Sequence, residues 1–247
     1  MRSDLTSRRA ALALAAALAV VAAAPALAQD APKKIRIGII GAGNIGGTIG
    51  TLWVKDGHEV MFASRHPETL AAMVSELGPK AKAGTPEEAI AFGDAVFFAV
   101  PYKAYPDLAK EIGPSLRGKV VLDAGNATQK RDGALYDEVQ ASGIGTTSAK
   151  YFPGAKLVRA FNAANYKVFA KEGAEGGKGR AGGRMAIPIA GDDPEALKVA
   201  EGLVRDAGFD PVVVGPLKEA DKFAMGSPGF GHDVTAPELR EKLGLAK

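Results

Sequence analysis

The chain has 247 residues, of which 47% are hydrophobic and 24% are charged, a composition typical of a globular protein with a substantial core. The formal net charge is +3, so composition does not indicate nucleic acid or a membrane surface as a partner. The sequence has no cysteine, which excludes disulfides, thiolate nucleophiles and thiolate-bound metals. Its three histidines lie too far apart in the sequence to predict a metal site.

The first 28 residues have the three parts of a secretory signal peptide. A twin-arginine pair, Arg8 and Arg9, precedes an apolar run that starts at Ala10, and small residues up to Ala28 suit cleavage after that position. We therefore expect an exported protein that is periplasmic and has no stable membrane span once the signal is cleaved. The alternative is an uncleaved membrane anchor, because the apolar run is almost long enough to cross a bilayer.

After a linker over residues 29–34, short apolar runs alternate with segments of helical periodicity. We expect strands at Ile35–Ile40, Glu59–Ala63, Ala95–Val100, Lys119–Asp123, Lys156–Phe161, Met185–Ala190 and Pro211–Val214. Helices are expected at Ile45–Asp56, Glu68–Leu77, Tyr105–Ile112, Gly133–Ser142, Asp192–Gly208 and Ala236–Leu243, with a further helix that starts after Thr85. The glycine-rich stretch Lys171–Gly183 is predicted to be a mobile loop. The alternation predicts an α/β fold of the Rossmann type, with a doubly wound, mostly parallel sheet.

Gly41, Gly43 and Gly46 form a G-x-G-x-x-G motif that directly follows the first strand and opens the next helix. In this context the first glycine permits the tight turn, the second lets the backbone approach a pyrophosphate, and the third allows close packing of helix on strand. The helix start also offers free N–H groups to phosphate oxygens. The motif predicts a dinucleotide site, and a purely structural glycine turn is the alternative.

The end of the second strand favours NADP over NAD. NAD-binding domains usually carry Asp or Glu at this distance from the glycines, where it accepts hydrogen bonds from the ribose hydroxyls. Here Ser64, Arg65 and His66 stand at that place. A carboxylate would repel a 2′-phosphate, whereas a hydroxyl and a guanidinium would bind one. The alternative is that Arg65 is a solvated loop charge.

Loops after the later strands complete the expected site. Pro101 and Tyr102, preceded by Val100, could flank the nicotinamide riboside, and Asn126 and Asn162 could bond its carboxamide or the acceptor. Simple turn chemistry is an equally good explanation of these residues. No acid–base pair is recognisable, which fits hydride transfer between two aligned planar rings but equally a protein without turnover.

Several segments resemble the NADPH-dependent F420 reductases, the F420:NADP oxidoreductase family. They are IRIGIIGAGNIGGTIG, HEVMFASRHPE, AVPYKAY, LVRAFNA and PIAGDDPEALKVAEGLVRDAGFDPVVVGPLKEA, and together they run from Ile35 to Ala220. The resemblance implies an NADP-type Rossmann fold with a small C-terminal extension, often dimeric, and direct hydride transfer between NADPH and a deazaflavin. It implies roles for these residues: Gly41, Gly43, Asn44, Ile45 and Gly46 at the pyrophosphate, and Ser64, Arg65 and a pH-dependent His66 at the 2′-phosphate. The loops after the later strands add Val100, Pro101, Tyr102, Asn126, Asn162 and Ala163 as expected cofactor-binding residues.

These observations lead to one expected organisation and three candidate functions. We expect an NADP-binding Rossmann domain over residues 35–165 and a smaller C-terminal α/β extension over residues 166–247, packed on the same sheet. The leading hypothesis is an NADPH-dependent oxidoreductase that passes hydride to coenzyme F420 or to a flavin-like acceptor such as FMN, in an exported variant of the family. The alternative is a non-catalytic NADP(H)-binding sensor or carrier in the periplasm. A reductase of small imines or 2-hydroxy acids ranks last, because those proteins usually need a helical dimerisation domain.

Overall fold

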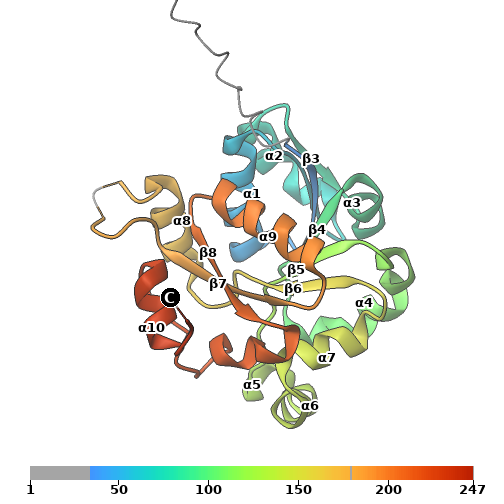
Figure 1. Cartoon of the computed structure of the whole chain (residues 1–247). Coiled ribbons are helices and arrows are strands. Elements are labelled where there is room, and N and C mark those ends of the chain that lie inside the picture. The colour runs from blue at the N-terminus through green and yellow to red at the C-terminus, as the bar shows by residue number, and fades with distance from the viewer. Residues whose placement is uncertain (1–33, 179, 247) are drawn as a thin grey trace, which may run out of the picture. The chain divides into compact units, whose positions relative to one another are not determined.

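The computed structural model describes residues 34–178 and 180–246, so the expected signal peptide and all but the last residue of the linker lie outside the described residues. Within the described part, the strands form one sheet in the order β3-β2-β1-β4-β5-β6-β7-β8 (Figure 1). The strands are β1 (Arg36–Ile40), β2 (Glu59–Ala63), β3 (Ala81–Gly84), β4 (Ala95–Phe98), β5 (Val120–Asp123), β6 (Lys156–Arg159), β7 (Ala186–Gly191) and β8 (Asp210–Gly215). This sheet confirms the predicted fold class.

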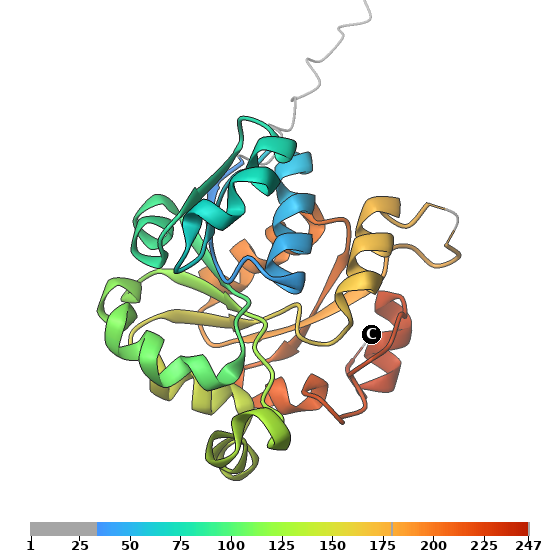
Figure 2. The same ribbon diagram turned by 180° about the vertical axis from the view of Figure 1, so that it is seen from behind.

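Helices cover both faces of the sheet (Figures 1 and 2). They are α1 (Asn44–Asp56), α2 (Ala71–Leu77), α3 (Pro86–Phe92), α4 (Tyr105–Glu111), α5 (Gln129–Asp132), α6 (Ala134–Ser142), α7 (Ile144–Tyr151), α8 (Tyr166–Glu175), α9 (Pro194–Asp206) and α10 (Ala236–Lys242). Short 3-10 helices add η1 (Pro67–Leu70), η2 (Tyr102–Ala104), η3 (Gly113–Leu116) and η4 (Leu217–Phe223). None of the described helices is long and apolar enough to span a membrane.

The core lies in two layers, one on each side of the sheet. On the side of α1 and α9, Trp53 packs edge-on against Phe97 and Phe161, and its indole N–H donates to the carbonyl oxygen of Leu203 at 2.8 Å. On the other side, Phe98 packs edge-on against Phe152. Because helices cover the central strands on both faces, the sequences of these strands are continuously apolar and do not alternate between apolar and polar residues.

The structure adds detail to the predicted sheet and corrects several local predictions. β3 was not expected, since its sequence AKAG lacks the β-branched residues of a strand, yet it pairs with β2 in parallel register. β7 runs antiparallel to β6, and β8 follows β7, so the last two strands are reversed relative to the others. α7 was missed. Residues 171–175 were assigned to a mobile loop but belong to α8, because Gly173 packs against Leu52 so closely that a Cβ would come within 2.4 Å of it.

Candidate nucleotide site

The glycine turn between β1 and α1 is built for a close approach of backbone to ligand. Gly41 has a φ of +100°, and a Cβ at Gly46 would lie 2.0 Å from the carbonyl oxygen of Gly41, so both positions require glycine for the fold itself. Gly43 differs, because no described heavy atom lies within 4 Å of the Cβ it would carry. Within the described residues, no side chain caps the first turn of α1. Its N–H groups, from Asn44 onwards, are therefore available to an anion.

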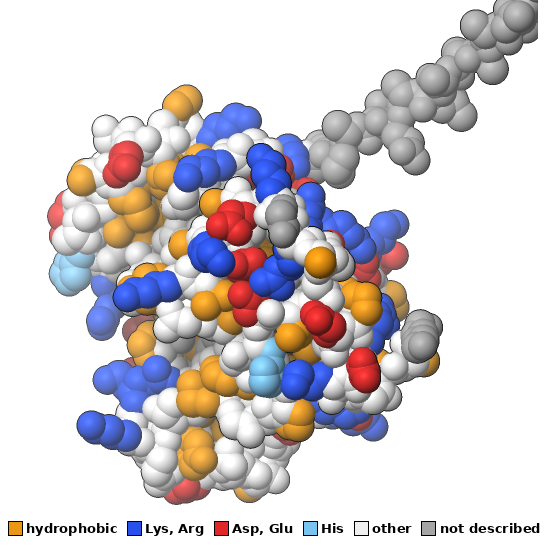
Figure 3. Space-filling view, turned by 90° about the vertical axis from the view of Figure 1, so that its left-hand side faces the viewer, with side chains coloured by type: hydrophobic (Ala, Val, Ile, Leu, Met, Phe, Trp, Pro, Cys, Tyr) orange, Lys and Arg blue, Asp and Glu red, His pale blue; other side chains and the backbone are white. Residues whose placement is uncertain are grey.

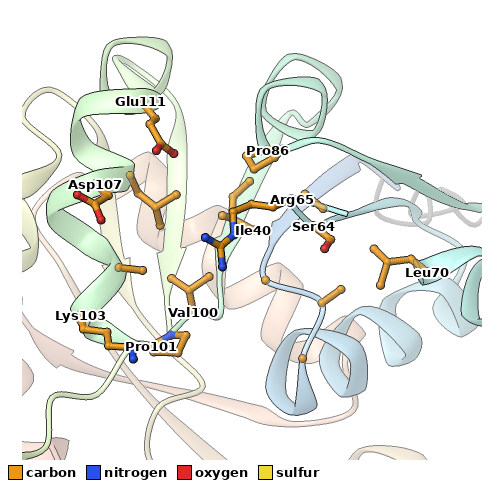
Figure 4. A pocket seen from close by; sticks show the side chains of 16 residues that line it. Ile40, Ser64, Arg65, Leu70, Pro86, Val100, Pro101, Lys103, Asp107 and Glu111 are labelled. Carbon is orange, nitrogen blue, oxygen red and sulfur yellow. The ribbon is translucent and has the colours of Figure 1, made fainter. Parts of the chain in front are cut away.

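A cavity of about 730 Å³, here called the main cavity, opens at the carboxyl ends of β1, β2 and β4. Gly41 and Gly43 line it on one side, and Val100 and Pro101 on another. Figure 4 shows the Arg65 side chain extending from the end of β2 across this cavity toward α4. The exposed guanidinium thus stands at the position that the sequence assigns to a 2′-phosphate.

Ser64 lines the main cavity, but its hydroxyl oxygen already accepts the backbone N–H of His66 at 3.0 Å. His66 was expected to help hold the phosphate. It is not among the residues that line the main cavity, its side chain is 75% exposed, and its Nδ1 lies 3.4 Å from Oε1 of Glu68. The reason is local: His66 is the N-cap residue of η1, and this turn directs its side chain to solvent.

Tyr102 is also placed differently from the expectation that it flanks the nicotinamide riboside. It is fully buried, stacks on Tyr105 at a centroid distance of 4.2 Å, and its hydroxyl lies 3.1 Å from Oγ of Ser148. Burial, with a smaller contribution from the charge of Asp123, raises the pKa of the Tyr102 hydroxyl well above its ordinary value. Tyr102 is therefore a core residue, whereas the preceding Pro101 does line the main cavity.

A second cavity of about 460 Å³ lies on the other side of the glycine turn, where Asn44 and Ile45 contribute to its wall. Asn126 and Asn162 line it from the ends of β5 and β6. The C-terminal segment closes it with Met225, Phe230 and His232. Gly43 lines the main cavity and its neighbour Asn44 lines the second, and both also line a third cavity of about 480 Å³. An extended ligand that crosses the glycine turn would therefore reach both the main and the second cavity.

Asn162 is the most constrained polar residue of the second cavity. It is 3% exposed, and its Nδ2 donates to the backbone carbonyl oxygen of Phe223 at 3.1 Å. Its backbone carbonyl oxygen accepts a hydrogen bond from Nδ2 of Asn126 at 2.8 Å. Its Oδ1 has no hydrogen-bond partner among the described residues. The preceding residue, Phe161, has a φ of +57°, which is unusual for a bulky side chain and characteristic of functional loops. Ala163, also buried, accepts the backbone N–H of Gly231 through its carbonyl oxygen at 2.7 Å.

The lining residues that sequence reasoning missed include Lys103 and Asp107 in the main cavity and His232 in the second. Lys103 and Asp107 follow the expected Pro101 loop at helical spacing, a signal that could have found them. His232 lies far from every predicted loop in the sequence, and only the packing of the C-terminal segment brings it here. Basic and acidic side chains are interspersed over the side of the molecule that carries α8 and α10 (Figure 3).

Known proteins resemble both the sequence and the fold. Residues 36–127 match the family model described as NADP oxidoreductase, coenzyme F420-dependent. Metalloreductase STEAP3 of Rattus norvegicus is 30% identical over 192 residues, which are 78% of this chain but 36% of that protein. The chain thus spans about a third of the length of this curated relative.

Two crystal structures share most of the fold. A hypothetical protein from Sinorhizobium meliloti has a TM-score of 0.68 and 25% identity, over 82% of this chain and 96% of that one. A proposed F420-dependent NADP reductase from Arthrobacter sp. FB24 has a TM-score of 0.64 and 21% identity, over 81% of this chain and 99% of that one. The chain is therefore similar to the F420-dependent NADP oxidoreductase family over residues 36–127, and it shares the fold of both crystal structures.

Proposed function

We propose that the protein is an NADPH-dependent oxidoreductase that passes hydride to a deazaflavin such as F420 or to a flavin-like acceptor such as FMN. The observation that carries the proposal is the arrangement of two cavities around one glycine turn. Arg65 lines one cavity, and the other is lined by Asn162, whose buried Oδ1 has no hydrogen-bond partner among the described residues. A dinucleotide with a 2′-phosphate at one end and a carboxamide at the other matches both features.

The chain's own residues take distinct roles in this proposal. Backbone N–H groups of Gly43, Asn44, Ile45 and Gly46 bind the pyrophosphate at the start of α1, and the Gly41 turn leaves room for it. Arg65, with Ser64, binds the 2′-phosphate. Val100 and Pro101 form the wall of the cavity beside the nicotinamide riboside. Asn126, Asn162 and Ala163 orient the nicotinamide, and a bound dihydronicotinamide then supplies the hydride at the second cavity.

The first test is binding of NADPH and NADH to the full-length protein, followed by nicotinamide fluorescence. FMN or the deazaflavin is then added while the absorbance of the reduced nicotinamide is recorded. Tight binding selective for NADPH, with oxidation by one of these acceptors, is the expected outcome. Binding without oxidation by any acceptor would favour the sensor or carrier function instead. If neither nucleotide binds, the proposal is wrong.

Export is a separate part of the proposal and rests on the sequence of residues 1–28 alone. Cell fractionation followed by N-terminal sequencing tests it. A periplasmic protein that starts at Gln29 is expected, and a membrane-bound protein of full length would favour the anchor.

A further inference from the structure

We propose that His232 is a catalytic acid in this reaction, which gives a proton to the acceptor ring as that ring receives the hydride. The inference rests on the proposed function, because it assigns a role within the second cavity. Sequence reasoning found no acid–base residue for hydride transfer. The structure brings one to the cavity wall from the distant C-terminal segment.

The position of His232 is fixed on both sides along the chain. The preceding residue, Gly231, donates its backbone N–H to the carbonyl oxygen of Ala163 at 2.7 Å, directly beside Asn162. Two residues later, the carbonyl oxygen of Val234 accepts the backbone N–H of Ala186 on β7 at 2.8 Å. His232 is therefore held between the β6 loop and the β7 edge. Its half-buried imidazole lines the same cavity as Asn126 and Asn162.

The neighbouring ionisable groups are engaged elsewhere or are poorer acids. Asp233 lines the cavity, but it forms an ion pair with Arg180, whose Nη2 also lies 3.1 Å from Oε2 of Glu172. Glu238 at the start of α10 accepts the backbone N–H of Thr235 at 2.7 Å. Tyr166 lines the cavity from α8, but a phenol gives up its proton far less readily near neutral pH than an imidazolium does.

The other two histidines have different surroundings. His58 is buried, and its Nε2 lies 2.9 Å from Oδ2 of Asp206. His66 is exposed beside Glu68. His232 is thus the histidine placed to exchange a proton with a molecule in the second cavity, and imidazole is the side chain whose charge changes most readily near neutral pH.

In the proposed reaction the acceptor is the oxidant and the dihydronicotinamide is the reductant. The two electrons and one hydrogen come from the dihydronicotinamide and enter the acceptor ring as hydride. The added electron pair makes a ring nitrogen at the far side of the conjugated system basic. The imidazolium N–H bond of His232 breaks, the proton forms a new N–H bond on that nitrogen, and the neutral imidazole regains a proton from solvent. Oxidised nicotinamide and an acceptor with one added hydride and one added proton result.

The test compares the wild-type protein with His232→Gln and His232→Ala at saturating NADPH, using FMN or the deazaflavin as acceptor. If His232 is a general acid, both variants should reduce the acceptor at least about 100-fold more slowly than the wild type. Their NADPH affinity should stay within about twofold of the wild-type value. The pH dependence of the wild-type rate should flatten in His232→Gln. Free imidazole should restore part of the rate of His232→Ala, which a merely structural role does not predict. The exposed Lys198→Gln on α9, which lines neither cavity, is the control, and it should keep the wild-type rate and pH profile.

A readout independent of turnover uses 15N-histidine NMR. The His232 signal, identified by its loss in His232→Gln, should shift when oxidised acceptor is added to the NADP⁺-bound protein. An unchanged rate and pH profile in His232→Gln, or a His232 signal that no acceptor moves, would overturn the inference while leaving the NADPH site intact. Failure of the wild-type protein to bind NADPH would instead refute the proposed function, and this inference with it.

Discussion

Nη1 of Arg159 lies 2.7 Å from Oδ2 of Asp123, and both side chains are fully buried at the ends of adjacent strands, β6 and β5. Burial by itself would lower the pKa of the Arg159 guanidinium, but the facing carboxylate leads the contributions that raise it, and the pKa is raised. Nη2 of Arg159 also donates to the carbonyl oxygen of Gly125 at 2.5 Å, and Oδ1 of Asp123 accepts the N–H of Gly125 at 2.9 Å. The pair therefore fixes the turn that carries Asn126.

Breaking this pair should destabilise the fold strongly. Arg159→Met leaves the Asp123 carboxylate buried without its counter-charge and should lower the free energy of unfolding by about 3 to 5 kcal/mol, measured by urea denaturation. The double variant Asp123→Asn/Arg159→Met should lose less, because no charge is left unpaired. The exposed pair of Arg36 and Asp94 is the control, since solvent screens this pair and Arg36→Met should destabilise the fold far less than Arg159→Met. An equal loss in the single and double variants would contradict this account.

Asp132 links the wall of the main cavity to the loop after β5, and it should make stability depend on acid pH. Oδ1 of Asp132 accepts the backbone N–H of Lys103 at 2.9 Å, and Oδ2 accepts that of Thr128 at 2.6 Å. Burial would raise the pKa of this carboxyl, but Arg131 and these N–H groups outweigh burial, and the pKa is lowered. The carboxylate thus stabilises the folded state above the unfolded pKa, about 3.9. This stability is lost as pH falls through the lower, folded pKa.

Asp132→Asn should accordingly reduce the free energy of unfolding at neutral pH and matter progressively less below about pH 4. Urea denaturation of both proteins over a series of pH values measures this difference. A difference that stays constant down to the most acidic pH would show that the charge of Asp132 is not involved.

The sequence correctly predicts those features of the fold that depend on residues close together in the chain. Glycine spacing after an apolar strand predicts the turn at Gly41, and the change from an acidic residue to Arg65 lies at a fixed distance from it. Tyr102 was misplaced because its direction depends on the docking of α7, which the sequence does not reveal. A charge at the end of each apolar strand marks Asp123 and Arg159, but only the parallel pairing of β5 and β6 makes them partners. His232 reaches the second cavity because its neighbours Gly231 and Val234 form hydrogen bonds with Ala163 and Ala186, both distant in the sequence.

Gly43 offers a substitution that separates binding from folding. Its φ of −79° suits any residue, and its Cβ would enter open space. Gly43→Ala should therefore leave the thermal midpoint nearly unchanged, while the added methyl group occupies the space proposed for the pyrophosphate and weakens both NADPH and NADH at least about tenfold. Gly46→Ala is the contrasting variant, because its Cβ meets the backbone of Gly41, and it should destabilise the fold. Unchanged nucleotide affinity in Gly43→Ala would mean that no phosphate lies there.

The unpartnered Oδ1 of Asn162 predicts recognition of an amide N–H. The analogue 3-acetylpyridine NADP⁺ keeps the carbonyl group of nicotinamide but replaces its NH₂ with a methyl group. Wild-type protein should bind NADP⁺ about fivefold more tightly than the analogue, and Asn162→Ala should bind both alike, as measured by calorimetric titration. If wild-type protein does not distinguish them, but a flavin methylated at its imide nitrogen binds worse than FMN, then Asn162 recognises the acceptor instead.

We predict that Arg65 determines which of the two nicotinamide cofactors the main cavity prefers. Its guanidinium extends into the cavity beside the end of β2 (Figure 4), where a 2′-phosphate would receive a charge-assisted hydrogen bond worth about 1.5 to 3 kcal/mol. Arg65→Asp removes that bond and adds repulsion, so NADPH affinity should fall about 100-fold or more. NADH should be nearly unaffected, because an aspartate here can accept hydrogen bonds from a ribose hydroxyl. The exposed Arg117→Asp, with the same change in charge outside the cavity, should leave the ratio of the two affinities as in the wild type. Equal losses for NADPH and NADH in Arg65→Asp would show that Arg65 supports the loop rather than the phosphate.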